Sequence, residues 1–258
     1  MQICARRIAE TGQFLLNVMT KDGFEENGLA INSIRMVRLI HVAIRHFIGD
    51  HWNEKNYGKP INQEDMVMTL LTFSVSLIDG LKQLSITEKE VLLAAYYTRW
   101  RAIGIVLGID EDMIPKTVDE GRLLLSIILK RNAESSESGV LLTKALIDFS
   151  KNSIPGKVFD VTPEVLISFF VGREISEYLG INDNAGCLGF GIPVIFVSLF
   201  QLGERVEENQ ESVNHIANKI SLKLMHGMVN YSDNYKKKNF EVPEEFKSAW
   251  NFNNGEDH

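Results

Sequence analysis

Apolar residues along this chain recur every three to four positions, and this spacing constrains the fold more than any other feature of the sequence. Such a period places apolar side chains on one face of an α-helix, whereas the strict alternation typical of strands is hard to find. We therefore predict an all-α fold, arranged as a single globular multi-helix domain. The predicted helices span residues 2–20, 31–52, 62–83, 87–108, 117–133, 139–152, 163–179, 193–206 and 208–231.

The loops between these helices are polar and of ordinary length. The serine-rich loop 133–139 is the best candidate for a domain boundary, but it is short. We therefore predict one domain over residues 1–231 and a polar C-terminal tail over 232–258. The run Lys236, Lys237 and Lys238 in this tail precedes several glutamates and is interpreted as solvated.

The charge and the cysteine content of the chain argue against several kinds of ligand and metal site. With 27 Lys and Arg against 34 Asp and Glu, the formal charge is −7. This balance argues against a general affinity for nucleic acid or anionic lipid. Cys4 and Cys187 support neither a disulfide framework nor a four-thiolate metal site, which favours a reducing compartment and a cytoplasmic location. The sequence predicts no particular oligomeric state.

The longest uncharged stretch, residues 185–202, reaches the length of about 18 residues at which a membrane span must be considered. Glycines interrupt its first half, so we predict a buried core helix. Membrane contact, including peripheral association, is the alternative.

A histidine and two arginines share the apolar face of the predicted helix 31–52. No carboxylate lies on this face, and an unpaired buried charge costs several kcal/mol. The arginines should therefore have anionic partners from elsewhere. At about 100° per residue, the residues within roughly 60° of His41 are Ile34, Val37, Arg38, Ile44, Arg45 and Ile48.

Two interpretations of this face remain open. A ligand with a large apolar body and two carboxylates would satisfy it, and haem has that form: a macrocycle for the isoleucines, propionates for the arginines and iron for the imidazole. Alternatively, Arg38 and Arg45 pair with acidic residues of another helix, and His41 is a hydrogen-bonded core histidine. His41, His46 and His51 are spaced by five residues, so a helix places them on different faces and they cannot jointly chelate one ion.

The predicted helix 2–20 shows a weaker version of the pattern. Its polar members are Arg7 and Thr11. Glu10 lies at the edge of the same face, where it could form an ion pair with an arginine of either helix. The apolar residues of this face are Cys4, Ile8, Phe14, Leu15 and Val18.

Four segments together resemble the catalytic domain shared by MpaB-type oxygenases and the latex-clearing proteins, or rubber oxygenases. They are RIAETGQF (7–14), RMVRLIHVAIR (35–45), PINQEDMVMTLLTFS (60–74) and YYTRWRAIGIVLGID (96–110). The resemblance implies an all-helical fold with non-covalent haem b, which uses dioxygen to cleave double bonds of isoprenoid chains. It implies that His41 is the axial iron ligand and that Arg38 and Arg45 contact the propionates. It also implies that Arg7 and Thr11 lie on the distal side of the haem.

Two departures from the family pattern affect this expectation. Latex-clearing proteins carry a lysine immediately before the threonine, able to close the sixth iron position, whereas this chain has Glu10. Glu10 is either a replacement polar group on the distal side or part of a surface ion pair with Arg6. Family members also carry a segment before this helix with an acidic residue implicated in catalysis, so we expect that group to lie upstream or to be missing.

Other family-like residues have ordinary explanations. Asn62, Glu64 and Asp65 are typical of a helix start, and Trp100 and Arg101 lie on or beside a packing face. The expected function is a haem b-dependent oxygenase whose partners are dioxygen and an apolar, unsaturated isoprenoid or lipid substrate. The alternative is a non-catalytic helical haem-binding or scaffold protein that retains the family fold.

Overall fold

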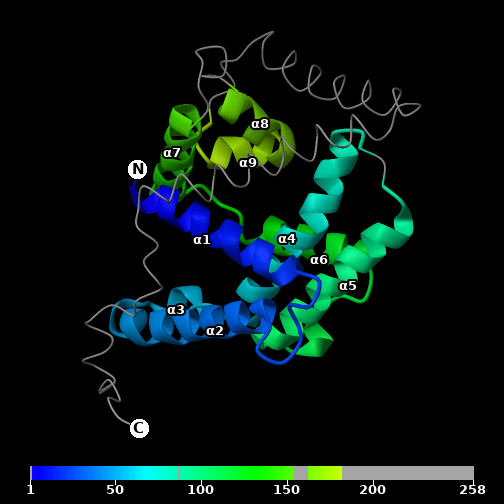
Figure 1. The fold of residues 1–258 in the computed structure, drawn as a ribbon. Helices are drawn as coiled ribbons and strands as arrows, with labels where there is room; N and C mark the ends of the chain where they lie inside the picture. Colours follow the sequence, from blue (N-terminus) through cyan, green and yellow to red (C-terminus); the bar gives the residue numbers. More distant parts are fainter. Residues whose placement is uncertain (1, 87, 154–161, 182–258) are drawn as a thin grey trace.

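The structure is a computed structural model that describes residues 2–86, 88–153 and 162–181. Within these ranges the chain forms helices and turns without strands, which confirms the predicted all-α class (Figure 1). The helices are α1 (Gln2–Met19), α2 (Leu29–Ile48), α3 (Glu54–Tyr57), α4 (Gln63–Gln83), α5 (Glu90–Leu107), α6 (Val118–Asn132), α7 (Glu137–Ser153), α8 (Thr162–Val171) and α9 (Arg173–Tyr178), with 3-10 turns η1 (Gly49–His51) and η2 (Glu111–Met113).

The predicted helix 163–179 is wrong in one respect, because Gly172 divides it into α8 and α9. Gly172 has a φ of +81°, in the left-handed region that interrupts a right-handed helix and that glycine adopts without strain. The predicted helices 193–206 and 208–231, the uncharged stretch 185–202 and the domain boundary at residue 231 lie outside the described residues.

Within the described residues, an apolar core lies among α1, α2, α4, α5 and α6. Trp100 of α5 is 1% exposed and stacks on Phe73 of α4, with ring centroids 5.3 Å apart. Gly104 allows this close approach, since a Cβ there would lie 2.8 Å from Cδ2 of Leu70. The predicted packing face of α5 is therefore confirmed. The buried members of the core are Val18, Ala30, Ile34, Met66, Val67, Leu70, Leu71, Val75, Ile78, Tyr97, Trp100, Ile103, Ile109, Ile114, Leu125 and Ile128.

Helices α1 and α2 form an antiparallel hairpin, with Asn17 Nδ2 donating to Ser33 Oγ at 2.8 Å. The hairpin turn is held by Arg99 of α5. Its Nε donates to the carbonyl of Val18 at 3.0 Å, and its Nη2 donates to the carbonyl of Thr20 at 2.8 Å. Its guanidinium also lies 4.2 Å from the ring centroid of Phe24. One side chain thus caps the end of α1 and packs on the following loop.

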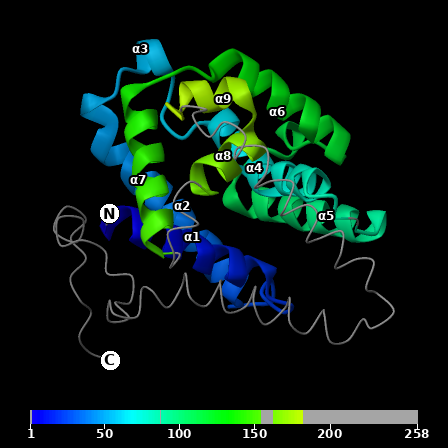
Figure 2. The same cartoon turned by 90° about the horizontal axis from the view of Figure 1, so that it is seen from above.

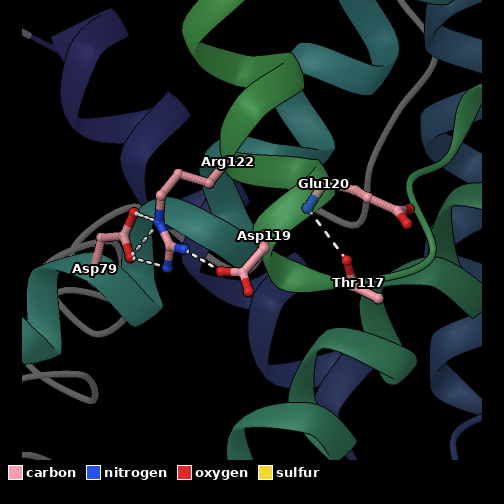
Figure 3. Close-up of polar contacts among 5 residues, drawn as sticks. All are labelled: Asp79, Thr117, Asp119, Glu120 and Arg122. Carbon is pink, nitrogen blue, oxygen red and sulfur yellow. Dashed lines mark hydrogen bonds and ion pairs between the residues drawn. The ribbon is translucent and has the colours of Figure 1, made fainter.

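Helices α4 and α6 are joined by an ion-pair cluster (Figure 3). Arg122 Nε and Nη2 donate to the carboxylate of Asp79, the shortest distance being 2.6 Å. Arg122 Nη1 donates to Asp119 Oδ1 at 2.5 Å. Next to this cluster, the side chain of Thr117 caps α6 by accepting from the amide of Glu120 at 3.2 Å.

In Figure 1, helices α7, α8 and α9 lie above α1 and α2 lies below it; Figure 2 views the same helices from above. Helix α7 packs against α1 and α8. Lys151 of α7 and Glu164 of α8 form an ion pair at 2.6 Å. Among the described helices, none is both long and apolar enough to cross a membrane.

Candidate functional site

The second half of α2 is less completely buried than its first half, although Ala43 is buried. Ala30 and Ile34 in its first half are completely buried, whereas His41 is only partly buried and Val42 is 52% exposed. The predicted apolar face is correct only in part. Arg35 and His46, which lie off that face, are exposed, but Arg38, which is predicted to lie on it, is exposed as well. His41 therefore lies between a closed core and solvent, on a helix held rigid at one end.

The two arginines on this face donate to backbone carbonyls of other elements. Arg38 Nη1 donates to the carbonyl of Val106, in the last turn of α5, at 3.1 Å. Arg45 Nε donates to the carbonyl of Pro60 at 3.2 Å, and its Nη2 donates to that of Ile61 at 2.7 Å. Within the described ranges neither arginine has a carboxylate partner. The alternative in which acidic residues of another helix neutralise them is therefore not what this part of the chain shows.

The contact at Ile61 holds an unusual backbone conformation. Ile61 has a φ of +52°, in the left-handed region that β-branched residues rarely adopt. The strained carbonyl is the one that Arg45 binds at 2.7 Å. Arg45 thus fixes the turn that leads into α4.

His41 has no hydrogen-bond partner among the described residues, so the core-histidine alternative is also not supported there. Burial lowers the pKa of His41 below its ordinary value, and the positive charge of Arg45 lowers it further. The imidazole is therefore neutral at physiological pH and keeps an unprotonated ring nitrogen. This is the form that ligates a metal.

Helix α1 brings its polar residues to the level of His41. Both helices rise about 1.5 Å per residue, so Ala9, eight residues before Asn17, lies level with His41, eight residues after Ser33. The turn that carries Arg7, Glu10 and Thr11 is therefore at the height of the histidine.

The side chains of that turn are engaged with one another. Glu10 Oε1 accepts from Arg6 Nε at 2.7 Å, and Oε2 accepts from Arg7 Nη1 at 3.1 Å. Thr11 Oγ1 donates to the carbonyl of Arg7 at 2.9 Å. Burial would raise the pKa of Glu10, but the hydrogen bonds and charges of both arginines outweigh it and leave the pKa below its ordinary value. Glu10 is thus an ionised carboxylate held between two guanidinium groups.

The predicted inward face of α1 is only partly right, because Arg7 and Thr11 are exposed. The reason is that α1 packs between α2 and α7, so apolar residues on two sides of the helix are covered and the polar turn remains outside. The predicted apolar members are inward: Cys4, Ile8, Phe14 and Leu15 are partly buried and Val18 is completely buried.

The residues around His41 fit a haem better than a metal ion bound by side chains alone. The described residues contain no group of three or more His, Cys, Asp or Glu that could hold a metal. A tetrapyrrole iron needs only one such ligand, and His41 is neutral and has no hydrogen-bond partner in the part of the chain that the structure describes. The arginines that flank it have N–H groups beyond those bound to carbonyls, since each guanidinium carries five donors. These donors suit carboxylates of the propionate kind.

The segment at the start of α4 connects this helix to α6 and to the end of α5, in addition to capping α4. Asn62 and Asp65 form a capping box, as predicted, with Asn62 Oδ1 accepting from the amide of Asp65 at 3.0 Å. Glu64 binds Arg131 and Asn132 of α6. Gln63, which sequence reasoning missed, donates through Nε2 to the carbonyl of Gly108 at 3.0 Å and accepts through Oε1 from the amide of Asp110 at 2.9 Å. Its only sequence signal is its place in a family-like segment.

Both the sequence and the fold of this chain are similar to those of known proteins. The sequence matches the family described as ER-bound oxygenase mpaB/B'/Rubber oxygenase, catalytic domain, over residues 2–182. It is similar to the rubber oxygenase of Streptomyces sp. (strain K30), with 24% identity over 182 residues that cover 68% of this chain and 44% of that protein. The fold is similar to that of latex clearing protein LCP in the closed state, with a TM-score of 0.67 and 20% identity over 76% of this chain and 53% of that one. The chain thus spans about half the length of these relatives.

Proposed function

Because the chain belongs to the family of the ER-bound oxygenase mpaB/B' and rubber oxygenase catalytic domain, we propose that it is a haem b-dependent oxygenase. Its co-substrate is dioxygen, and its substrate is an apolar, unsaturated isoprenoid or lipid. The observation that carries the proposal concerns the described part of the chain. There, a neutral His41 has no hydrogen-bond partner and stands in α2 between two arginines that have no carboxylate partner.

Three side chains of α2 would hold the cofactor. His41 would bind the iron through its unprotonated nitrogen, and Arg38 and Arg45 would donate their remaining N–H groups to the propionates. The bound haem would supply the activation of dioxygen, which no side chain of the described residues can provide.

Helix α1 would supply the polar groups on the distal side, namely Arg7, Glu10 and Thr11. Glu10 stands where latex-clearing proteins carry a lysine, so no amine from this position competes with dioxygen. The ionised carboxylate of Glu10 would hold a proton or orient a polar atom there once it separates from Arg6 or Arg7.

The apolar surroundings of α2 favour a hydrocarbon substrate over a polar metabolite. On the face of α2 that carries His41, Ile34 is completely buried and Val37, Ile44 and Ile48 are partly buried. The low cysteine content fits a cytoplasmic enzyme, which is part of the same proposal.

The cofactor is tested by reconstitution with hemin, followed by the visible spectrum. We expect a Soret band in the wild-type protein that changes or disappears in His41→Ala. The matched control is His46→Ala, because His46 lies on the same helix but is exposed. A Soret band that persists unchanged in His41→Ala would remove the assignment.

A second candidate function is a helical haem carrier, sensor or scaffold. It is favoured by the bonds of Arg38 and Arg45 to backbone carbonyls, which give both arginines a structural role without any ligand. Oxygen uptake by the hemin-loaded protein with polyisoprene oligomers, farnesyl compounds and unsaturated fatty acids separates the candidates. No uptake on any of them supports the second.

A further inference from the structure

The backbone segments that bind Arg38 and Arg45 are themselves joined by Gln63. Arg38 donates to the end of α5 at Val106, and Arg45 donates to the turn at Pro60 and Ile61 that precedes α4. Gln63 is the first residue of α4 and binds both Gly108 and Asp110, just beyond the end of α5. The contacts therefore run from α2 to α5, through Gln63 to α4, and back to α2.

The end of α5 has the geometry that this network needs. Gly108 has a φ of +94° and reverses the chain at the C-terminus of α5. A Cβ at Gly108 would lie 3.7 Å from both Cζ and Nη2 of Arg38, so the guanidinium packs directly on this turn. Gln63 binds the same turn from α4. Arg38 and Gln63 thus contact one short segment from two different helices.

We propose that Gln63 is a positioning residue that fixes Arg38 and Arg45 on either side of His41. It does not touch the histidine or a ligand. It holds the two backbone segments that accept from the arginines, and so limits the directions in which their guanidinium groups can point. The effect of Gln63 on hemin binding rests on the proposed function, whereas the network itself is a property of the protein alone.

The test uses the apoprotein of the full chain with Gln63→Met, which keeps the side-chain length and removes both hydrogen bonds. We expect the amide of Asp110 to exchange with solvent about 2- to 10-fold faster, the range for one net hydrogen bond. The Arg45 Nε–H signal in nitrogen-15 NMR spectra should exchange faster by a similar factor. The matched control is Gln83→Met, because Gln83 ends the same helix, is exposed and has no hydrogen-bond partner among the described residues.

The two signals decide the inference together. Faster exchange at Asp110 with an unchanged Arg45 signal would show that Gln63 only secures the end of α5, and it would overturn the proposal. If Gln63→Met does not fold, Gln63→Glu serves instead. Its ionised carboxylate can accept from Asp110 but cannot donate to Gly108, whereas its protonated form can do both. Relative to the wild type at the same pH, the Arg45 signal should therefore regain protection as the pH falls. A difference from the wild type that does not change with pH would contradict the inference.

Hemin titration separates this inference from the proposed function. We expect Gln63→Met to bind hemin about 2- to 10-fold more weakly than the wild type, because Gln63 acts only through the positions of Arg38 and Arg45, and the loss should not exceed the net free energy of about one hydrogen bond. A wild-type protein without hemin affinity would end the proposed function, while the apoprotein signals would still decide the role of Gln63. Unchanged affinity and an unchanged Soret band in a variant with altered apoprotein signals would overturn the positioning role.

Discussion

Two pairs of arginines at the same height of the molecule have opposite surroundings. Arg6 and Arg7 of α1 share the carboxylate of Glu10, and their side chains are 70% and 63% exposed. Arg38 and Arg45 of α2 have no carboxylate within the described residues and donate to carbonyls of distant segments. A carboxylate one helical turn away therefore decides whether an arginine is neutralised locally or remains available to another anion.

The largest expected effect concerns stability and the α2 pair. Arg45→Met removes two charge-assisted hydrogen bonds to carbonyls, each contributing about 1.5–3 kcal/mol, so the free energy of unfolding should fall by about 3–6 kcal/mol. Arg7→Met removes an exposed ion pair and should cost less than about 0.5 kcal/mol. Urea unfolding of both apoproteins measures the difference. Equal losses would abolish the distinction between the pairs.

The next effect concerns ligand binding. Arg38→Gln should raise the dissociation constant of hemin about 10- to 100-fold, which corresponds to one charge-assisted contact of about 1.5–3 kcal/mol. Arg6→Gln is the control on α1 and should leave the constant unchanged. Hemin titration followed at the Soret band gives both values, and equal weakening in the two variants would contradict the assignment of propionate contacts to α2.

The two helices should also differ in their response to pH. Burial and the charge of Arg45 keep the pKa of His41 below its ordinary value, so its ring nitrogen stays free at neutral pH. As the pH falls through that lowered pKa, protons compete with iron and hemin affinity should fall about tenfold per pH unit. Apoprotein stability should decrease at higher pH, between about 6.5 and the lowered pKa, because in that interval the unfolded histidine binds a proton that the folded one does not. The measurement is a titration of hemin affinity against pH. A loss of affinity that began above about pH 6.5, the ordinary pKa of histidine, would contradict a lowered pKa of His41.

The smallest expected effect is that of Glu10→Gln. The pKa of Glu10 is lowered, so its ion pair contributes fully above the ordinary pKa of a glutamate and is lost as the pH falls through the lowered value. The side chain is 38% exposed, and solvent screening limits the contribution at neutral pH to less than about 1 kcal/mol. Thermal unfolding at pH 7 and at pH 3 measures it. A variant that loses more stability at pH 3 than at pH 7 would reverse the predicted sign.

Helical periodicity predicted most of the fold because the apolar side chains that recur at a helical spacing are the ones buried in the core. Ile34, Trp100 and Val18 lie inside as their positions on predicted helices require. The split at Gly172 escaped prediction, since a single glycine inside an apolar helical pattern is compatible with a continuous helix.

The partners of Arg38 and Arg45 could not be predicted from the sequence. Every residue carries a carbonyl, and only the three-dimensional positions of the end of α5 and the turn before α4 show which carbonyls an arginine can reach. The same holds for Gln63, whose two contacts depend on the left-handed turn at Gly108. The exposure of Arg7 and Thr11 could not be predicted either, because α1 packs against both α2 and α7, and the position of α7 is not given by the sequence of α1.

The hydrogen bonds of Arg99 to the α1–α2 turn bear on the order in which the helices fold. The hairpin is local in sequence, but the side chain that caps it comes from α5, at a sequence separation of 81 residues from Val18. Contacts of such separation are entropically costly and form late in many small proteins. We therefore expect the hairpin turn to close only after α5 has docked. Arg99→Met should then speed unfolding and leave the refolding rate nearly unchanged in stopped-flow experiments.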